Sequence, residues 1–547
     1  MNVLLLSMPD SFEHMPPVAV RMPNGALASL AGNVDAHHRV SIADLILVQS
    51  SARATVERLV RDLQPDVVGL SVMTFQRTTA LALASFIRAL RPSVRIVAGG
   101  YDPSLAPRAY EASPAIDFVV RGEGEQTLSE LLRALERSAP TFAEGYGGST
   151  VARSASGGGT ALAERPDLSA IRGLSYRTAD GFVRNPDRPI MTLASNPLGL
   201  PNRDARVLGG YTMLGRTVDV VETSRGCTFD CSFCSIIEMR GRNFHPYPID
   251  RVLADVADAR AHGAESIFLV DDNITLDVKR FEQLCEAIID AGFQDTDFVV
   301  QAMTAPIAQH GARLAPLMRR AGFRYVFLGI ENVVDDDLEF LKARAKNVHR
   351  EGGRTIGNAS IEAIRHLHEN GMYVVGGLIV GNPDDTRGAI ETNLEFAREH
   401  VDWPYIQHPT PYPGTPMTRE FQDRGLIVDE DVSHYDGTTA VVRTEHVAAE
   451  DVEFLRWRAE RWMKVRHMPA ALAHSPLYVL QNAFAMLAHT FAGTTLRSLV
   501  GLEDERAVFA RFREHRRRER DAYRQADVWC EPPTAVSRIK ESCAPSS

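Results

Sequence analysis

Three cysteines that lie close together provide the clearest chemical signal of the chain. Cys227, Cys231 and Cys234 follow a C-x3-C-x2-C spacing in the segment SRGCTFDCSFC. A closed structural metal site takes four protein ligands, whereas three thiolates around a four-iron cluster leave one iron open to bind another molecule. Gly226 gives the backbone room to approach a metal, and Phe233 is expected to shield the cluster from water. The spacing therefore predicts an iron–sulfur centre with a free coordination position.

Two other interpretations of these cysteines are a zinc site that borrows a fourth ligand, for which His245 is available, and three unrelated buried thiols. Zinc motifs more often come as two paired C-x2-C units, which favours the iron–sulfur interpretation. The other cysteines are predicted to lie outside the cluster. Cys285 has apolar neighbours at helical spacing, which is typical of a core position. Cys530 and Cys543 lie in a tail rich in proline and serine and are expected to be surface thiols.

The composition is that of an ordinary globular protein. The 547 residues are 44% hydrophobic and 24% charged, enough for roughly two to four domains. A net charge of -10 gives no support for nucleic-acid binding, and six cysteines are too few for a disulfide scaffold. The first residues lack the basic region of a signal peptide, and no uncharged apolar run suggests a membrane span. We therefore expect a cytoplasmic protein.

The first part of the chain alternates short apolar runs with helical patterns, notably at 77–90 and 126–136. The expected strands are 3–7, 40–45, 67–71, 94–98 and 118–120. Such alternation predicts an α/β domain with a doubly wound, Rossmann-like sheet over residues 1–137. Residues 138–194 are predicted to form a linker rich in glycine and serine, followed by a hairpin that turns at Asp180-Gly181.

A second alternating region covers residues 195–445. Its expected strands are 218–223, 267–271, 298–302, 325–329, 374–380 and 405–409. Helical patterns follow the first five, which predicts a (βα)6 partial TIM barrel with its working face at the carboxyl ends of the strands. The cysteine segment falls in the first βα loop. Residues 446–547 are predicted to be a helical C-terminal region, in which the apolar stretch 477–499 forms either a packed helical subdomain or a surface for a lipid-like substrate.

The cysteine motif, the aromatic residue before its last cysteine and its place on the first βα loop together resemble the signature of radical S-adenosylmethionine (SAM) enzymes. The resemblance covers roughly residues 195–445. It implies that Cys227, Cys231 and Cys234 hold a [4Fe-4S] cluster whose open iron chelates SAM. In that family an electron from the cluster cleaves SAM to methionine and a 5′-deoxyadenosyl radical. A small-molecule substrate and an electron donor such as flavodoxin or ferredoxin are implied as partners, without nucleic acid.

The same resemblance implies SAM contacts at the ends of later strands. Asp271 and Asp272 take the place of the family segment that contacts the methionyl amine, and a carboxylate can accept hydrogen bonds from an ammonium group. Glu331, in the segment Gly-Ile-Glu, resembles the residue that contacts the ribose. The glycines of 376–381 resemble a segment against which adenine lies. The alternative for each acidic residue is a simple cap at the end of a buried strand.

In the first domain, Ser71 and Met73 follow one expected strand and Gly99-Gly100 follows the next. This pattern resembles the S-x-L and G-G segments of cobalamin-binding domains, with Met73 in place of leucine, where small residues let the nucleotide tail of cobalamin lie against the backbone. Gly122 and Glu123 belong to the segment RGEGE, which resembles one found in cobalamin-type radical SAM enzymes. The alternative is a Rossmann-like domain with ordinary turns.

One motif departs from the cobalamin-binding pattern D-x-H-x-x-G. Asp35 and His37 imitate its start, but Val40 stands where glycine is expected, and the segment runs into the second strand. We therefore interpret His37 and His38 as surface or turn residues. The resemblance then implies a cobalt ion without a histidine lower ligand, as is usual in the radical SAM branch.

Taken together, the resemblance implies a C-methyltransferase acting on an unactivated carbon of a small molecule or natural-product intermediate. In such enzymes the deoxyadenosyl radical removes a hydrogen atom, and the substrate radical takes a methyl group from methylcobalamin, which a second SAM restores. The alternatives are a ring-forming enzyme with both cofactors, like the oxygen-independent porphyrin-ester cyclase, and an iron–sulfur electron carrier. No catalytic acid or base is identified. Arg344, Lys346 and His434 lie in expected loops, where solvation is as good an interpretation as substrate contact.

Overall fold

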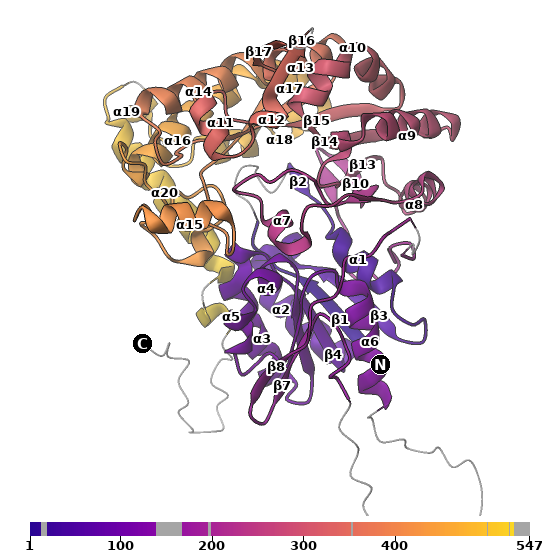
Figure 1. Cartoon of the computed structure of the whole chain (residues 1–547). Helices are drawn as coiled ribbons and strands as arrows, with labels where there is room; N and C mark the ends of the chain where they lie inside the picture. Colours follow the sequence, from indigo (N-terminus) through magenta and orange to yellow (C-terminus); the bar gives the residue numbers. More distant parts are fainter. Residues whose placement is uncertain are drawn as a thin grey trace, which may run out of the picture.

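The computed structural model describes residues 1–11, 19–137, 167–194, 198–351, 354–499, 501–524 and 526–529. Two sheets organise these residues: one lies in the lower, indigo and purple half of Figure 1, and the other in the upper, magenta and orange half. Most of the expected linker, at 138–166, and the two C-terminal cysteines, Cys530 and Cys543, fall outside the described residues. The α/β fold class predicted from the sequence is confirmed.

The first sheet has seven strands in the order β3-β1-β4-β5-β6-β7-β8. Its parallel strands are β1 (Asn2–Ser7), β3 (Arg39–Asp44), β4 (Val67–Ser71), β5 (Arg95–Gly99) and β6 (Phe118–Val120). The expected hairpin, β7 (Leu174–Thr178) and β8 (Gly181–Arg184), pairs antiparallel with β6, so it extends this sheet. Ser71 pairs with both Ser7 and Gly99, and the carboxyl ends of three strands therefore meet at one edge.

Strand alternation explains the layers on either side of this sheet. Leu4 and Leu6 belong to one apolar cluster, with α2 (Ala52–Leu63) and α3 (Arg77–Leu90). Val3 and Leu5 belong to a second cluster on the other face, with α1 (Gly25–Gly32) and α6 (Gly124–Arg137). Both faces of the parallel strands are therefore buried, as a doubly wound sheet requires. Two short helices, α4 (Tyr101–Leu105) and α5 (Pro107–Glu111), lie between β5 and β6.

The second sheet contains the six predicted parallel strands in sequence order. They are β10 (Arg216–Val221), β13 (Ser266–Leu269), β14 (Asp297–Met303), β15 (Phe323–Glu331), β18 (Tyr373–Ile379) and β19 (Trp403–Gln407). Beyond β10, the antiparallel strands β9 (Thr212–Met213) and β2 (Val20–Arg21) extend it. Because β2 comes from the start of the chain, the first domain contributes a strand to the barrel sheet.

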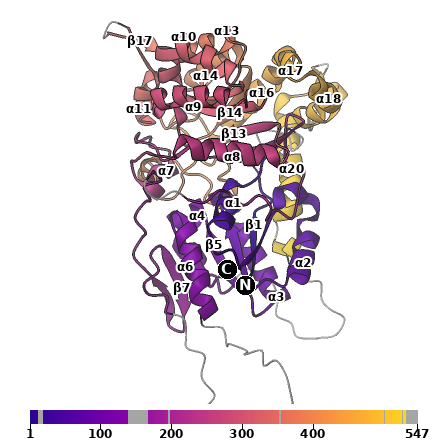
Figure 2. The ribbon, with the colours of Figure 1, turned by 90° about the vertical axis from the view of Figure 1, so that its right-hand side faces the viewer.

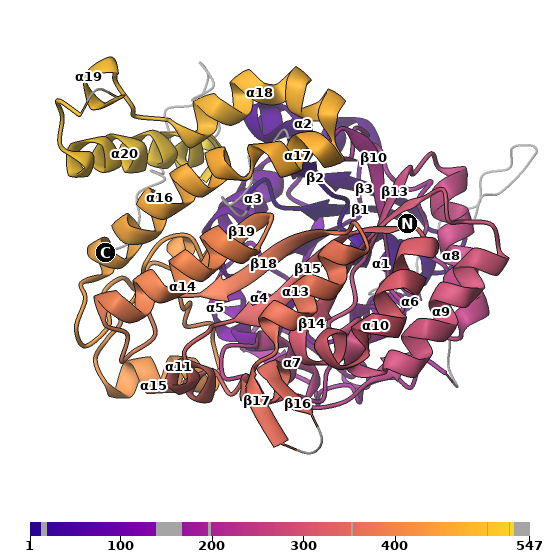
Figure 3. The same ribbon diagram turned by 90° about the horizontal axis from the view of Figure 1, so that it is seen from above.

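Helices cover the outside of this barrel (Figure 3). The main ones are α8 (Ile249–Ala261), α9 (Val278–Asp290), α10 (Thr304–Arg320), α13 (Ser360–Glu369) and α14 (Arg387–His400). The shorter elements are β11 (Ser224–Arg225), α7 (Ser235–Arg240), β12 (His245–Pro246), α11 (Asp335–Phe340), α12 (Arg344–Asn347), β16 (Val348–Glu351), β17 (Arg354–Asn358) and α15 (Pro416–Asp423). The largest apolar core of the described residues lies between the strands and these outer helices.

The helical C-terminal region consists of α16 (Ala449–Arg466), α17 (Met468–His474), α18 (Pro476–Thr490), α19 (Leu496–Leu499) and α20 (Glu505–Arg524). The last of these runs from the barrel down to the first domain (Figures 1 and 2). There Arg524 Nε donates to Asp10 Oδ1 at 2.6 Å, and Trp529 packs against Phe86. Arg524 and Trp529 therefore connect the helical C-terminal region to the first domain. Among the described residues, no helix combines the length and apolar character that crossing a membrane requires.

Candidate functional site

The cysteine loop leaves the barrel after β10 and returns to it before α8. Its base is closed by the antiparallel pair β11 and β12, in which Arg225 is opposite His245. Gly226 has φ +90°, and a Cβ atom there would lie 2.3 Å from Asn243 Oδ1. Glycine is therefore required for the loop to close on Asn243, which is a packing reason in addition to the approach to a metal.

The three cysteines are held in this loop without forming a compact single-ion site. Cys227 and Cys231 are buried, and Cys234 is half-buried just before α7. A tetrahedral zinc ion with bonds of about 2.3 Å needs ligand atoms roughly 3.8 Å apart. Among the described residues, no three metal-ligating atoms that include a cysteine sulfur lie within 4.8 Å of one another. The described residues therefore do not form a closed zinc site around these cysteines.

Lys346, which the sequence left open between solvation and substrate contact, lies beside these cysteines. Its Nζ is 3.3 Å from Glu331 Oε1 and 5.8 Å from the centre of the Phe233 ring. Burial opposes the charged form, but the Glu331 carboxylate and the cysteine sulfurs outweigh it, so the pKa of Lys346 is raised. Solvation of Lys346, left open from the sequence, is wrong, because the side chain is largely buried. It places a permanent positive charge next to the thiols.

The two other loop residues behave differently. Arg344 is exposed, with Asp335 at 3.5 Å, so it belongs to the solvated surface. His434 is half-buried, and its Nδ1 lies 2.7 Å from Asp429 Oδ2.

Glu331, predicted to contact the ribose of SAM, has an unusual backbone. It lies at the end of β15 with φ +62°, where the register between β15 and β18 shifts. A non-glycine residue in this region stores strain, and such strain is concentrated at functional sites. The geometry turns the carboxylate towards Lys346, so Glu331 and Lys346 form one charged unit at the barrel mouth.

The two acidic residues predicted to contact the methionyl amine hold the cysteine loop. Asp271 is buried and accepts hydrogen bonds from the backbone N and Oγ1 of Thr223, at 2.6 and 2.5 Å, and from Ser224 Oγ at 2.5 Å. Burial raises the pKa of Asp271 to about 6, although these hydrogen bonds oppose the shift. Asp272 accepts from the backbone N of Gly226 at 2.7 Å and pairs with Arg240 at 3.2 Å. Both carboxylates therefore fix the loop to β13.

Asn273, which completes this acidic segment, contacts a cysteine directly. Its Nδ2 is 3.7 Å from Cys227 Sγ and 3.0 Å from Met303 Sδ. The glycines at 376 and 377 have packing partners within the barrel. Added Cβ atoms there would meet Val401 at 2.5 Å and the Phe327 ring at 2.9 Å. Close packing inside the protein therefore accounts for glycine at both positions.

A cavity of about 390 Å³ separates the carboxyl edge of the first sheet from the cysteine loop. Every residue predicted to contact cobalamin lines this cavity: Ser71, Met73, Gly99, Gly100, Gly122 and Glu123. From the other side it is lined by barrel residues that include Glu222, Arg225, Met239, Arg240 and Tyr247. The residues predicted to contact cobalamin therefore face the start of the cysteine loop, at Arg225, and the end of α7, at Met239 and Arg240, across this cavity.

Two glycines on the first-sheet side of the cavity have positive φ. Gly100 has φ +102°, and a Cβ atom there would lie 2.9 Å from the backbone N and O of Val72. Gly122 has φ +73° with no atom within 4 Å of an added Cβ, and its N–H donates to Ser104 Oγ at 3.0 Å. Such an edge, made of backbone and small side chains, fits the flat face or tail of a large cofactor. The residues present therefore fit cobalamin.

Glu123 and its neighbour Glu125 also join the two domains. Arg225, just before the cysteines, lies 2.7 Å from Glu125, 2.8 Å from Glu222 and 3.4 Å from Glu123. Burial opposes the charged form of Glu125, but Arg225 outweighs it and lowers the pKa of this carboxyl group to about 2. Part of the RGEGE segment thus docks the first domain on the cysteine loop.

Tyr101 in α4 is a further site residue that the sequence did not reveal. It lines the cavity from the first domain, and its phenol faces Arg240, Asp272 and Cys234 of the barrel. The only signal was its place directly after Gly99-Gly100.

The histidines at 37 and 38 lie away from the cavity. His37 is exposed and its Nε2 is 2.9 Å from Glu136. His38 is buried and its backbone N–H donates to Asp35 O at 3.0 Å, so it fits the interpretation as a turn residue and not as a surface residue. Neither histidine lines the cavity, in agreement with a cobalt ion that lacks a histidine from this segment.

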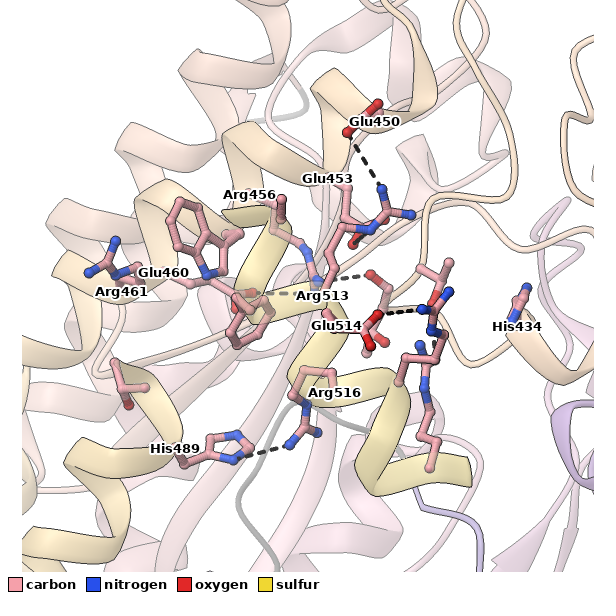
Figure 4. Close-up of a pocket in the computed structure, with 18 of the residues that line it drawn as sticks. His434, Glu450, Glu453, Arg456, Glu460, Arg461, His489, Arg513, Glu514 and Arg516 are labelled. Atoms are coloured by element: carbon pink, nitrogen blue, oxygen red, sulfur yellow. Dashed lines mark hydrogen bonds and ion pairs between the residues drawn. The ribbon is translucent and has the colours of Figure 1, made fainter. Parts of the chain in front are cut away.

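A second cavity, of about 410 Å³, lies among the C-terminal helices (Figure 4). Its charged side chains pair across helices. Arg513 is 3.4 Å from Glu453 and 3.6 Å from Glu450, and Arg516 Nη1 is 3.3 Å from His489 Nδ1. These contacts hold α16, α18 and α20 together, so the cavity is best understood as part of the helical packing.

Comparisons with known proteins agree with this architecture. The family model for the B12 binding domain matches residues 16–132, and that for the radical SAM superfamily matches residues 221–397. An uncharacterized methyltransferase of Pyrococcus horikoshii is 27% identical, covering 84% of this chain and 91% of the relative. The anaerobic magnesium-protoporphyrin IX monomethyl ester cyclase of Cereibacter sphaeroides is 26% identical, covering 78% of this chain and 63% of its own length. The hopanoid C-3 methylase of Methylococcus capsulatus is also 26% identical, covering 70% of this chain and 65% of its own length.

Among solved structures, the radical SAM methyltransferase TsrM from Kitasatospora setae, with cobalamin and a [4Fe-4S] cluster bound, has a TM-score of 0.57 at 18% identity. The match covers 77% of this chain and 78% of TsrM, and it shows a shared fold. The two family models and the structural match thus agree with the two sheets of the fold. The chain therefore contains a B12-binding domain and a radical SAM domain, and it is similar to cobalamin-dependent radical SAM enzymes.

Proposed function

We propose that this protein is a radical SAM C-methyltransferase that acts on an unactivated carbon of a small molecule or natural-product intermediate. The observation that carries the proposal is the single cavity between the glycine-lined edge of the first sheet and the cysteine loop. It brings a methyl donor on one side and a radical source on the other within reach of one substrate. Methyltransferases among the relatives support the same activity.

In this proposal the first domain, residues 1–137, binds cobalamin, and Cys227, Cys231 and Cys234 in the radical SAM domain, 195–445, hold the [4Fe-4S] cluster. When bound, the cluster and SAM supply the means to remove a hydrogen atom, and cobalamin supplies a methyl group. Lys346 offers an ammonium group next to the cysteines, where it can pair with the carboxylate of SAM. Glu331 fixes Lys346 and lies where a ribose hydroxyl can donate to it.

The protein's own groups also protect the reaction. Apolar side chains dominate the cavity wall, and the ion pairs of Arg225 close the domains over it. Excluding water in this way prevents a reactive carbon centre from being quenched. A cytoplasmic location and an electron donor such as flavodoxin or ferredoxin complete the proposal, because the cluster must be kept reduced.

A ring-forming reaction without methyl transfer is the second candidate, since anaerobic cyclases are among the relatives. The deciding experiment is anaerobic. Cluster and hydroxocobalamin are loaded, and SAM, reductant and candidate substrates are added. We expect S-adenosylhomocysteine and 5′-deoxyadenosine to form together with a methylated product. Deoxyadenosine with a cyclised, unmethylated product would instead establish the second candidate.

A further inference from the structure

One face of α18 exposes large apolar side chains to solvent. Leu477 is 74% exposed, Leu480 69%, Phe484 86% and Leu487 44%. Their spacing of three, four and three residues places them on the same side of the helix. Twelve large apolar side chains are exposed among the described residues, and these four make up a third of them. Isolated exposed apolar residues are normal in proteins, but a continuous stripe of this kind marks an interaction surface.

The opposite face of α18 is firmly anchored. Tyr478, Val479 and Met486 are buried in an apolar cluster that includes Tyr325, Tyr373 and Trp403 of the barrel strands. The exposed stripe therefore does not reflect a helix that has failed to pack. Figures 2 and 3 show α18 on the outer edge of the molecule, where the stripe is accessible to a large surface.

The charge pattern around the stripe is unusual. Residues 468–496 contain no Asp, Glu, Lys or Arg, and His474 and His489 are their only titratable side chains apart from Tyr478. Exposed arginines border this stretch on both sides, Arg466 before it and Arg497 after it. Trp462, which is 53% exposed, packs against Phe491 near the end of α18. Apolar side chains bordered by cations and an exposed tryptophan match the requirements of a lipid–water interface.

We propose that the α18 stripe docks the enzyme on the surface of an anionic lipid bilayer. The helix lies in the plane of the interface, with Leu480 and Phe484 inserted among the acyl chains and the bordering arginines at the lipid phosphates. A symmetric contact between two copies fits less well, because it would bring arginines with the same charge together. The proposal concerns an interaction surface and does not depend on which reaction the enzyme catalyses.

The test is flotation of the cluster- and cobalamin-loaded enzyme with vesicles of phosphatidylglycerol and phosphatidylcholine, compared with phosphatidylcholine alone. We expect binding to the anionic vesicles that weakens at high salt. The double variant Leu480→Gln/Phe484→Gln should bind at least about ten-fold more weakly, because two large apolar side chains no longer leave water. The control is Ile361→Gln/Val428→Gln, which removes two apolar side chains on other surfaces that are also more than half exposed, 54% and 53%, and should bind like the wild type.

Iron content, corrinoid absorbance and deoxyadenosine formation in solution should be the same in both variants and the wild type, which shows that they fold. Failure of the wild type to bind anionic vesicles would overturn the proposal, as would undiminished binding of the Leu480/Phe484 variant. Sedimentation velocity tests whether a second copy of the chain binds the stripe. A wild-type dimer that this variant dissociates, without any vesicle binding, would assign the stripe to a second copy of the chain instead.

Discussion

The carboxyl edge of the first sheet and the cysteine loop of the barrel line opposite sides of the same cavity. They differ in the residues that form them. The sheet edge presents Gly99, Gly100 and Gly122, and its fit depends on the space that they leave. The cysteine loop is surrounded by Lys346, Asp272 and other charged groups with close partners. The difference indicates that the first surface is defined by shape and the second by charge. We therefore expect substitutions that change side-chain volume to weaken cofactor binding mainly at the sheet edge. Substitutions that remove a charge should impair mainly the cysteine loop.

Loss of a thiolate should give the largest effect. Cys231→Ala removes one of three proposed cluster ligands, so we expect both the iron–sulfur absorbance and SAM cleavage to be abolished. The control is Cys285→Ala, which changes a buried cysteine of α9 in the apolar core. It should retain the cluster and SAM cleavage. Anaerobic iron analysis and chromatography of 5′-deoxyadenosine measure both outcomes, and persistent SAM cleavage in Cys231→Ala would refute the assignment of the cluster.

Removing the charge of Lys346 should come second. Lys346→Met keeps much of the side-chain volume but deletes the ammonium group, and we expect SAM cleavage to fall by about 100-fold, as for other positioned electrostatic groups. Lys346→Arg should recover part of this loss. The control Arg344→Met changes an exposed residue of the same short helix and should have no effect. SAM cleavage by Lys346→Met at the wild-type rate would show that the positive charge beside the cysteines is not needed for SAM cleavage.

A change of volume should instead affect the first-sheet side. In Gly100→Val the added side chain meets the backbone of Val72, and we expect retention of corrinoid to fall at least about ten-fold while SAM cleavage continues. Gly263→Val is the control, since Gly263 also has positive φ, +90°, but no atom lies within 4 Å of its added Cβ. Absorbance after gel filtration measures bound corrinoid. Equal loss in the two variants would show that strain at a glycine with positive φ, rather than the clash with Val72, causes the effect.

The sequence predicted the residues at the edge of the first sheet better than the charged residues around the cysteine loop. Small residues at strand ends are visible in the sequence, and Ser71, Met73 and Gly99-Gly100, which were predicted to contact cobalamin, all line the cavity. The six barrel strands and α3 were also predictable, because apolar periodicity records them directly. Tyr101 was not predicted, and the sequence could not decide between solvation and substrate contact for Lys346, since each residue comes near the cysteine loop only when a distant segment folds against it. That Asp271 and Asp272 contact SAM stays a prediction, and their hydrogen bonds to Thr223 and Gly226 depend on tertiary structure.

The smallest effect should come from the ion pair that joins the two sides. Glu125→Gln leaves the buried Arg225 with one partner fewer, and we expect the free energy of unfolding to fall by about 3 kcal/mol at neutral pH. Glu130→Gln, in the same helix but with a more exposed carboxylate, should cost less than about 1 kcal/mol. Urea unfolding followed by circular dichroism measures both.

The pH dependence of this difference tests its origin. Because the folded-state pKa of Glu125, about 2, lies below its ordinary value of 4.5, the ionised carboxylate stabilises the fold above about pH 4.5. This contribution is lost as the pH falls from 4.5 towards 2. The gap in stability between the wild type and Glu125→Gln should therefore be constant from pH 7 to pH 5 and narrow below pH 4.5. If the difference in the free energy of unfolding stayed constant down to pH 3, Glu125 would stabilise the contact between the two domains through packing and not through its charge.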